Sequence, residues 1–440
     1  MKGEYLRLKI KKLEVIKLYN MYDYNIEFND DITFLHGKNG CGKTTILNII
    51  TYIITGRIYK LFSYDFEKII LTYKKDKENE LICFSKIENN IKISFKDQEI
   101  DIDKISKIEE DELEGSNRLL RYSANSIELH YFNKYPILKV IKDLFDFVYI
   151  PLNRKNLENI MKLPPLYRRY YRYHKGLKEK LGDTTEPIYN IANIILDNYA
   201  KIRSEISGMG KTLQINIVKA MYQYNINDYV NSNVFKNDTI KKDIENFKRA
   251  HLYDDELGEL IKSFYEKLLK SENEKNKNTS EQLEYVFNVS KLAQMSKIND
   301  VFNQYDDKVK ELKEPITKLE TIVNRFFEDS AEKKKLVIEE EDIYFITEYN
   351  NRRVEIYDLS SGEKQILILF TYLVFDIASK QNPIFIIDEP ELSLHLLWQK
   401  NLVNSVLETN KNIQLILATH SPEIIANNRD KAYKVELKIK

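Results

Sequence analysis

Eight residues near the N-terminus have the types and the spacing of a loop that binds phosphate. They run Gly37-Lys38-Asn39-Gly40-Cys41-Gly42-Lys43-Thr44 and match the pattern G-x-x-x-x-G-K-[ST]. Glycines allow backbone N–H groups to turn toward one anion, and the amino end of a following helix adds partial positive charge. We expect Lys43 to reach the β- and γ-phosphates of a nucleotide and the Thr44 hydroxyl to bind Mg²⁺. Thr45 completes the predicted nucleotide-binding set.

Such a loop needs a strand before it and a helix after it, and the sequence predicts both. Residues 32–35 are apolar enough for a buried strand, and residues 45–55 repeat isoleucine at helical spacing before Gly56. An ordinary glycine-rich turn between a strand and a helix is the alternative, and these flanking elements disfavour it.

Two acidic residues, Asp388 and Glu389, follow a second apolar run, Ile384 to Ile387. Asp388 could hold the hydration shell of Mg²⁺, and Glu389 could orient or deprotonate an attacking water. Strands often end in acidic turn residues, so this motif alone does not indicate a metal site. The phosphate loop upstream favours that interpretation.

Two further segments could complete a nucleotide site. Leu359-Ser360-Ser361-Gly362-Glu363-Lys364-Gln365 opens the apolar run 366–378, and its serines could be plain helix N-caps. Residues 415–418 form a predicted strand that places His420 at its end, beside the Asp388 strand of a parallel sheet. A histidine there could sense a γ-phosphate, or it could be a cap or a surface residue.

Taken in this order, the four motifs resemble those of the ABC-type ATPases, and most closely those of the RecF, SMC and OLD branch. The resemblance implies that Lys43 and Thr44 are the phosphate-loop lysine and threonine. It implies that Asp388 is the Mg²⁺ carboxylate and Glu389 the catalytic glutamate. His420 matches the switch histidine of the family and joins Glu389 as a predicted catalytic residue.

The resemblance also implies a signature that meets the nucleotide of an opposite subunit. Its residues are Ser360, Ser361, Gly362 and Glu363. The sequence departs from the usual LSGGQ wording at Ser361, where glycine is usual, and at Glu363, where glutamine is usual. Residues 393–395 fall at the D-loop of the family, and Asn153 or Arg154 is the candidate for its Q-loop.

Pattern and resemblance together predict an α/β fold. This is an ABC-type ATPase head with a mixed or parallel sheet, helices, and antiparallel strands in its N-terminal lobe. We expect an N-terminal lobe over 1–154, a helical insertion over 155–335 and a C-terminal lobe over 336–440. Alternating apolar and polar residues predict a meander over 65–103 and a hairpin over 343–357.

The helical insertion narrows the choice of branch. Polar links near 205–212, 232–238 and 270–280 predict a set of helices. This region as a whole is too short and too broken for the long coiled-coil arms of SMC-like proteins. No Toprim or HNH nuclease motif is visible in the sequence, unlike in the OLD nucleases. The sequence therefore looks most like the stand-alone ATPase subunits of bacterial anti-phage systems. The Septu ATPase, which works with an HNH nuclease, and the PARIS ATPase, which works with a Toprim effector, are of this kind.

This resemblance implies an ATP-binding and ATP-hydrolysing sensor or scaffold that uses ATP and Mg²⁺. It implies a head-to-head dimer or higher homo-oligomer that controls a separately encoded effector, a nuclease of the HNH or Toprim type, and no nuclease site in this chain. The alternative is a RecF-like repair ATPase that loads partners on DNA. An ABC transporter subunit is a third interpretation, which the helical insertion disfavours.

Composition limits the partners further. The 440 residues carry 68 Lys and Arg against 68 Asp and Glu, so binding to nucleic acid would need a local basic patch. No apolar stretch reaches the ~18 residues of a membrane helix, and the N-terminus lacks the features of a secretory signal. We therefore expect a cytoplasmic protein without a membrane partner. Two cysteines are too few for a disulfide framework.

One basic stretch within the insertion, residues 166–175, alternates cations with aromatic residues. Arg168, Arg169 and Arg172 could contact the phosphates of DNA or RNA while the neighbouring tyrosines stack on bases. The same pattern suits partner docking. It equally suits a helix that packs its aromatic rings inward and turns its arginines to solvent.

Overall fold

The computed structural model describes residues 8–439 with gaps, and the chain divides into two compact units. Met1–Leu196 with Lys318–Lys440 form the first, called the head unit here, and Asp197–Thr317 form the second, called the helical unit. The undescribed residues within 8–439 are 77, 106–122, 146, 152–185, 224–253 apart from 245 and 248, 274–278, 331, 341, 378–379, 381–382 and 427.

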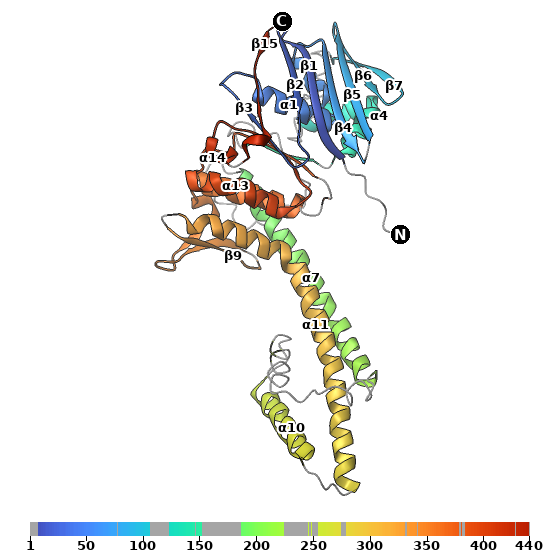
Figure 1. The fold of residues 1–440 in the computed structure, drawn as a ribbon, viewed down its shortest axis with the longest axis vertical. Coiled ribbons are helices and arrows are strands. Elements are labelled where there is room, and N and C mark those ends of the chain that lie inside the picture. The colour runs from blue at the N-terminus through green and yellow to red at the C-terminus, as the bar shows by residue number, and fades with distance from the viewer. Residues whose placement is uncertain are drawn as a thin grey trace. The chain divides into compact units, whose positions relative to one another are not determined.

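The head unit contains a five-stranded parallel sheet, of which Figure 1 labels strand β3. Every neighbouring pair in it is parallel. The strand order is β14 (Ala432–Lys434), β3 (Ile32–His36), β13 (Gln414–Ala418), β12 (Ile384–Asp388) and β8 (Phe147–Pro151). The predicted parallel sheet is therefore confirmed. The sheet places β13 between the strand that precedes the phosphate loop and the strand that ends in Asp388.

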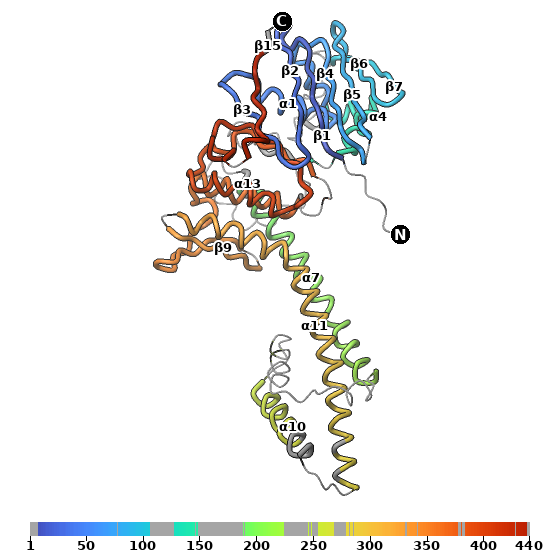
Figure 2. The backbone as a smooth tube through the Cα atoms, in the orientation of Figure 1, coloured from blue at the N-terminus to red at the C-terminus, as the bar shows by residue number. Residues whose placement is uncertain are grey.

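A second sheet of seven antiparallel strands belongs to the same unit. In order, its strands are β15 (Lys438–Ile439), β2 (Tyr22–Glu27), β1 (Leu8–Leu18), β4 (Lys68–Lys75), β5 (Glu78–Ile87), β6 (Asn90–Phe95) and β7 (Gln98–Asp103). Strands β4 to β7 confirm the predicted meander. Figure 2 shows how the last strand of the chain returns to pair with β2.

Helix α1 (Lys43–Ile54) lies in a core that it shares with both sheets. Ile46, Ile49 and Ile50 are fully buried and belong to one cluster with residues of β1, β4, β12 and β13. A helix that is apolar on most of its surface must be covered on most sides. Helices α3 (Ser123–Lys134) and α4 (Pro136–Leu144) contribute to the same cluster.

The buried side chain of Gln414, at the start of β13, ties the two sheets together. Its amide nitrogen donates to the carbonyl oxygens of Ile10, at 2.7 Å, and Asn29, at 2.8 Å. Its oxygen accepts from the backbone N–H of Ile10 at 2.8 Å. The two bonds to Ile10 satisfy buried backbone groups, so this one side chain fixes β13 against β1.

The rest of the head unit begins with a small antiparallel sheet of β9 (Lys334–Ile338), β10 (Ile343–Thr347) and β11 (Arg353–Glu355). Its second turn contains Asn350 and Asn351, as predicted. The chain continues into α12 (Ser361–Tyr372), called the signature helix here, and later into α13 (Leu396–Thr409) and the short α14 (Pro422–Ile425).

Three long helices account for the described part of the insertion: α7 (Glu186–Tyr222), α10 (Asp255–Asn273) and α11 (Thr279–Glu328). The predicted link at 205–212 is wrong, because α7 is continuous through Gly208 and Gly210. Each glycine costs a helix about 1 kcal/mol relative to alanine, which a helix of 37 residues tolerates. The break between α10 and α11 falls at the predicted link 270–280, and α11 has 50 residues.

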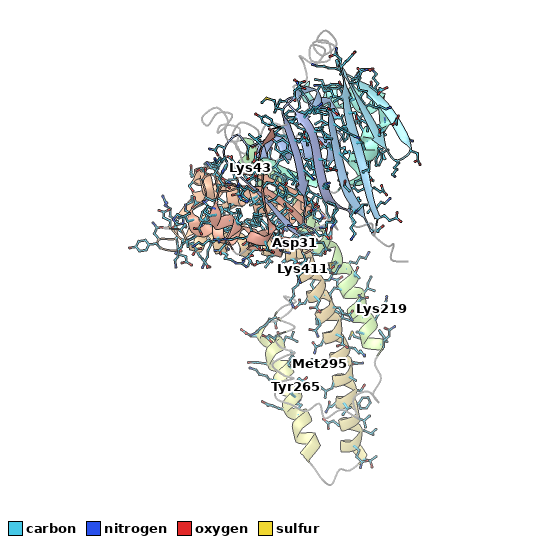
Figure 3. All side chains as sticks on the ribbon, turned by 45° about the horizontal axis from the view of Figure 1, so that its top comes forward. Asp31, Lys43, Lys219, Tyr265, Met295 and Lys411 are labelled. Atoms are coloured by element: carbon cyan, nitrogen blue, oxygen red, sulfur yellow. The ribbon has the colours of Figure 1, made fainter. Side chains whose placement is uncertain are left out.

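Within the helical unit, these helices pack on one another. Tyr265 and Ile261 of α10 form a small apolar cluster with Leu292 of α11, against which Met295 also packs (Figure 3). The side-chain amide of Gln294 donates to the carbonyl oxygen of Met221 at the end of α7. Among the described residues, no helix is both long enough and apolar enough to span a membrane.

Candidate nucleotide site

The carboxyl ends of β3, β13 and β12 bring three of the four predicted motifs together. These strands are neighbours in the parallel sheet, and parallel strands open their carboxyl ends at one edge, where ligands of such sheets bind. The phosphate loop leaves β3, His420 follows β13, and Asp388 ends β12. Figure 3 marks the place of Lys43 at the start of α1.

The phosphate loop adopts a backbone that requires glycine at its turn into α1. Gly42 is the N-cap of α1, with a φ of 95° in the left-handed region. A Cβ atom there would lie 2.5 Å from the hydroxyl oxygen of Tyr24. That hydroxyl donates to the carbonyl oxygen of Cys41 at 3.1 Å. The loop is therefore held by Tyr24 and closed to any side chain at position 42.

Lys43 is buried, with 5% of its surface exposed, and its ammonium group points back into the loop. Nζ donates to the carbonyl oxygens of Gly37, at 3.3 Å, and Lys38, at 3.5 Å. It also lies 2.6 Å from Nε2 of His420. Lys43 and His420, from two separate motifs, are thus in direct contact.

Asp388 is 6% exposed, and its Oδ1 has no hydrogen-bond partner among the described residues. Burial raises the pKa of this carboxyl to about 6, against the lowering effect of a hydrogen bond from the Thr44 hydroxyl. A buried polar atom without a partner is costly and often marks a ligand position. Carboxylate and hydroxyl oxygens are the donors that Mg²⁺ prefers. Asp388 and Thr44 therefore fit the predicted Mg²⁺.

Glu389 turns out of the strand toward solvent. Its φ of 50° is uncommon for a residue with a side chain, and its N–H donates to the carbonyl oxygen of Ala418 at 2.8 Å. Oε1 lies 3.9 Å from Nε2 of His420, and both side chains are about one-third exposed (33% and 34%). This geometry leaves room for water beside two groups that could orient it.

Glu391 holds the loop that carries His420, and no motif in the sequence singles it out. Its carboxylate accepts from the Thr419 hydroxyl at 2.8 Å and from the backbone N–H of His420. The Thr419 hydroxyl accepts in turn from the N–H of Ser421 at 2.9 Å. In the sequence, Glu391 is simply another acidic residue shortly after the strand that ends at Asp388. No sequence rule predicts its contact with Thr419, 28 residues away.

The predicted signature residues lie at the start of the signature helix. Ser360 is its N-cap, and Ser360 and Ser361 are exposed, whereas Gly362 and Glu363 are buried. A Cβ atom on Gly362 would lie 2.4 Å from the carbonyl oxygen of Ser393. The signature therefore packs on the D-loop position of its own head, and the hydrogen bonds of Ser360 and Glu363 do not go to the phosphate loop.

Several predicted residues fall outside the part of the chain that the structure describes. Arg168, Arg169 and Arg172 are among them, as are the Q-loop candidates Asn153 and Arg154.

Comparison with known proteins adds a family match and named relatives. Residues 231–426 match a protein family described as "AAA domain, putative AbiEii toxin, Type IV TA system". The "Retron Vc95 probable ATPase" of Vibrio cholerae is 26% identical over 453 residues, which span 96% of this chain and 73% of the relative. The "Retron Ec83 probable ATPase" of Escherichia coli is 39% identical over 92 residues, 18% of this chain and 16% of the relative.

A repair protein is similar over a shorter segment. The "DNA replication and repair protein RecF" of Desulfitobacterium hafniense is 39% identical over 54 residues, 12% of this chain and 15% of the relative. The chain is thus similar to two probable ATPases along its length or part of it, and to RecF over a short segment.

Proposed function

We propose that the chain binds ATP with Mg²⁺ at the edge of the parallel sheet and hydrolyses it. The observation that carries this proposal is the convergence of Lys43, Asp388, Glu389 and His420 from three neighbouring strands. The phosphate loop Gly37–Thr45 supplies backbone N–H groups at the start of α1, where anions are favoured. An ATPase fits these residues better than a simple nucleotide carrier, because Glu389 and His420 face solvent where an attacking water would stand.

Each residue then has a defined role. The Lys43 ammonium exchanges its loop carbonyls for phosphate oxygens, which are stronger acceptors. Asp388 and Thr44 hold Mg²⁺, which neutralises charge on the phosphates when it is bound. Glu389 orients the attacking water or accepts its proton. His420, already against Lys43, moves with the terminal phosphate and so reports its presence.

We further propose that a second copy completes the site. Ser360 and Ser361 are exposed at the amino end of the 12-residue signature helix, where free N–H groups favour anions. The hydrogen bonds of Ser360 go to Glu363 and not to the phosphate loop of its own chain. A head-to-head dimer would place them over the nucleotide of the opposite head, and a two-fold axis would create two such sites.

The biological role we propose is an ATP-dependent sensor or scaffold of a bacterial defence unit that controls a separately encoded nuclease of the HNH or Toprim type. Its support is similarity to probable retron ATPases, one of which aligns along 96% of this chain. A RecF-like ATPase that loads partners on DNA is the second candidate, supported by the 54-residue similarity to RecF.

The proposed role can be tested by measuring phage resistance in cells that carry this gene together with its genomic neighbour. We expect the two-gene unit to confer phage resistance and Lys43→Ala to abolish it, whereas Lys411→Ala, an exposed lysine of the same unit, should not. The purified chain alone should cut neither DNA nor RNA. Cleavage by the lone chain contradicts the partner model. Equal phage sensitivity with and without the unit, joined to sensitivity to DNA damage on deletion, favours repair.

A further inference from the structure

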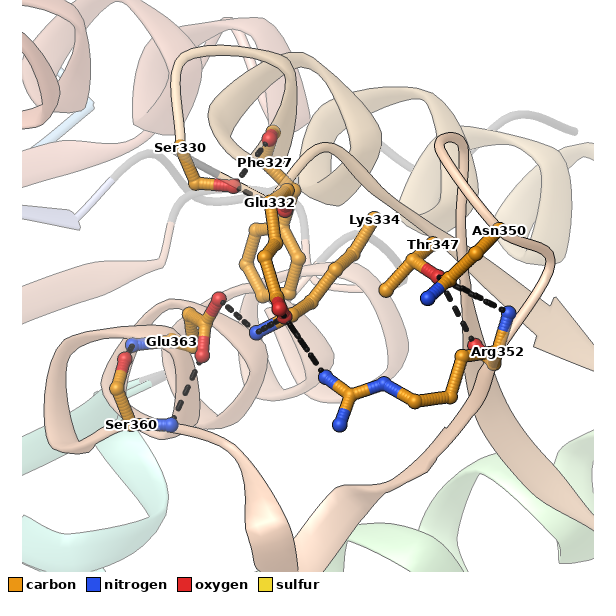
Figure 4. A network of polar contacts seen from close by, with 9 residues as sticks. All are labelled: Phe327, Ser330, Glu332, Lys334, Thr347, Asn350, Arg352, Ser360 and Glu363. Atoms are coloured by element: carbon orange, nitrogen blue, oxygen red, sulfur yellow. Dashed lines mark hydrogen bonds and ion pairs between the residues drawn. The ribbon is translucent and has the colours of Figure 1, made fainter.

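A buried ion pair lies directly beneath the signature. Nζ of Lys334, in β9, is 2.8 Å from Oε1 of Glu363, in the signature helix, and the two side chains are only 11% and 6% exposed (Figure 4). Among the described residues, no other ion pair has both side chains so buried. Two charges removed from water need good geometry and further hydrogen bonds to persist.

The same carboxylate sets the conformation of Ser360. Oε2 of Glu363 accepts from the backbone N–H of Ser360 at 2.8 Å, and the N–H of Glu363 donates to the Ser360 hydroxyl at 3.4 Å. This reciprocal pair is a capping box. Glu363 thus uses one oxygen for Lys334 and the other for Ser360, so Lys334 acts on the serine through a single side chain.

Charge distinguishes Glu363 from the glutamine usual at this position. Burial raises the pKa of Glu363, but the hydrogen bonds from Lys334 and Ser360 outweigh burial and leave the pKa below its ordinary value. A glutamine could still accept from the N–H of Ser360 through its amide oxygen. It could not balance the charge of Lys334, whose other acidic neighbour, Glu332, is farther away (3.9 Å from Nζ) and 56% exposed. The buried glutamate at 363 is therefore stabilised by the cation at 334, and the two residues act as one unit.

Lys334 is itself held firmly, because the elements on either side of it are anchored in the head core. Phe327, in the last turn of α11, stacks on Phe345 of β10 at 4.8 Å and on Trp398 of α13 at 5.8 Å between ring centroids. Phe326 packs on Phe370 of the signature helix at 5.3 Å. The start of β9 and the signature helix thus share one rigid support.

We propose that Lys334 is a positioning residue for the signature: its ion pair with Glu363 holds Ser360 in the orientation that meets the nucleotide of the opposite head. This inference rests on the proposed shared ATP site. Lys334 touches no nucleotide and contributes nothing to binding within one head. Its loss should therefore affect head pairing and hydrolysis and spare nucleotide affinity.

The test compares Lys334→Met with Lys335→Met. Lys335 is the next residue of β9, and its partner Glu348 lies at 2.9 Å in an exposed pair (56% and 40%). Nucleotide affinity is measured on dilute protein with a fluorescent ATP analogue. Pairing is measured from the dependence of hydrolysis on protein concentration. We expect Lys334→Met to weaken pairing about 10- to 100-fold, the loss of a hydrogen bond between charged groups, with nucleotide affinity unchanged.

Two rescue variants separate positioning from general stability. Lys334→Arg keeps the charge and should retain pairing. The double variant Lys334→Met with Glu363→Gln leaves no unpaired buried charge and keeps an acceptor for Ser360, so it should pair better than Lys334→Met alone. If Lys334→Met fails to fold, the double variant decides, because it should fold and pair within about threefold of the Lys335→Met control.

Three results overturn the inference: pairing by Lys334→Met equal to that of Lys335→Met, loss of nucleotide affinity in parallel with pairing, or a folded double variant that does not pair. Failure of the shared site itself looks different. In that case the wild-type protein binds no ATP, or it hydrolyses ATP at a rate per head that does not depend on protein concentration.

Discussion

The edge of the parallel sheet and the start of the signature helix differ in how their polar groups are satisfied. At the sheet edge, Oδ1 of Asp388 is buried without a partner among the described residues, and Lys43 donates to loop carbonyls and a histidine. At the signature, Ser360 and Glu363 satisfy each other, and Lys334 completes the set. At the sheet edge a buried carboxylate oxygen lacks a partner among the described residues, whereas at the signature the side chains of Ser360, Glu363 and Lys334 all have partners.

The difference assigns the two regions different roles. Unpaired buried groups cost free energy in the empty protein, and a ligand that pairs them returns that free energy as binding. The paired side chains of the signature gain nothing from local rearrangement, so they hold the exposed Ser360 in one arrangement. The sheet edge is therefore suited to bind a charged ligand. The signature already has its final conformation, so it is suited to contact that ligand without rearranging.

Removal of the sheet-edge cation should have the largest effect. Lys43→Ala deletes an ammonium aimed at the phosphates, and we expect nucleotide affinity to fall about 100-fold or more, as for the loss of charged hydrogen bonds. Titration with a fluorescent ATP analogue measures this, with Lys411→Ala as the control of equal charge. Unchanged affinity in Lys43→Ala would remove the phosphate loop from the site and with it the contrast between the two regions.

Glu389→Gln should come next, because it separates binding from turnover. The amide keeps the size of the side chain and loses its basicity, so hydrolysis should fall about 10²- to 10³-fold while ATP still binds. The trapped protein should remain paired, since nucleotide that is not hydrolysed continues to favour the paired state.

Disulfide crosslinking checks the pairing of this variant. Cysteines placed at Ser360 of one chain and Asn39 of another should react more in the presence of ATP. Asn39 is exposed and suits the purpose better than Gly40, whose φ of 79° disfavours a side chain. Crosslinks that never form, or form equally without ATP, refute the head-to-head arrangement.

The sheet edge could be predicted from the sequence because it depends on topology alone. Parallel strands end at one edge whatever their loops do, so Asp388 and His420 had to lie near the phosphate loop. The structure confirms that these strands are neighbours and adds the 2.6 Å contact between Lys43 and His420. That contact depends on side-chain orientation, which no pattern in the sequence encodes.

The signature and the insertion were less accessible from the sequence. The capping box of Ser360 and Glu363 follows a local sequence rule. The ion pair of Glu363 with Lys334 joins a helix to a strand, and no sequence pattern relates the two positions. Glu391 was missed for the same reason, since its partners lie on another loop. The glycines of α7 indicate a link by local propensity, and the length of the surrounding helix overrides that propensity.

Gly362→Ala should have an intermediate effect, confined to the signature. Its new Cβ would lie 2.4 Å from the carbonyl oxygen of Ser393 and 3.4 Å from the ring of Trp398, so the signature or the D-loop position must shift. We expect hydrolysis to fall about tenfold, the cost of one disturbed contact, with nucleotide affinity unchanged. Paired measurements of affinity and turnover test this.

Gly208→Ala is the matched control for that change. A Cβ on Gly208, within α7, meets nothing within 4 Å, and alanine favours the helix by about 1 kcal/mol. Hydrolysis should therefore be unaffected. If Gly362→Ala lowers nucleotide affinity as much as turnover, the signature and the sheet edge are not separable within one head, and the comparison between them fails.

The smallest effect on hydrolysis is expected outside both regions, in the basic stretch 166–175. Replacing Arg168, Arg169 and Arg172 by alanine should leave basal hydrolysis intact, because none of the four predicted nucleotide motifs includes these residues. If the stretch binds nucleic acid, affinity for single-stranded DNA or RNA should fall. The slope of log affinity against log salt should then decrease by about 2, near 0.7 for each phosphate that an arginine no longer neutralises.

A control of equal charge decides whether that effect is local. Three exposed lysines of α11 can be replaced by alanine together: Lys308, Lys310 and Lys313. Both triple variants lower the net charge by the same amount, so a general electrostatic attraction would weaken equally in the two, whereas a defined contact would weaken only in the arginine variant. If the triple arginine variant still binds nucleic acid and still controls the effector, the stretch 166–175 has a structural role only.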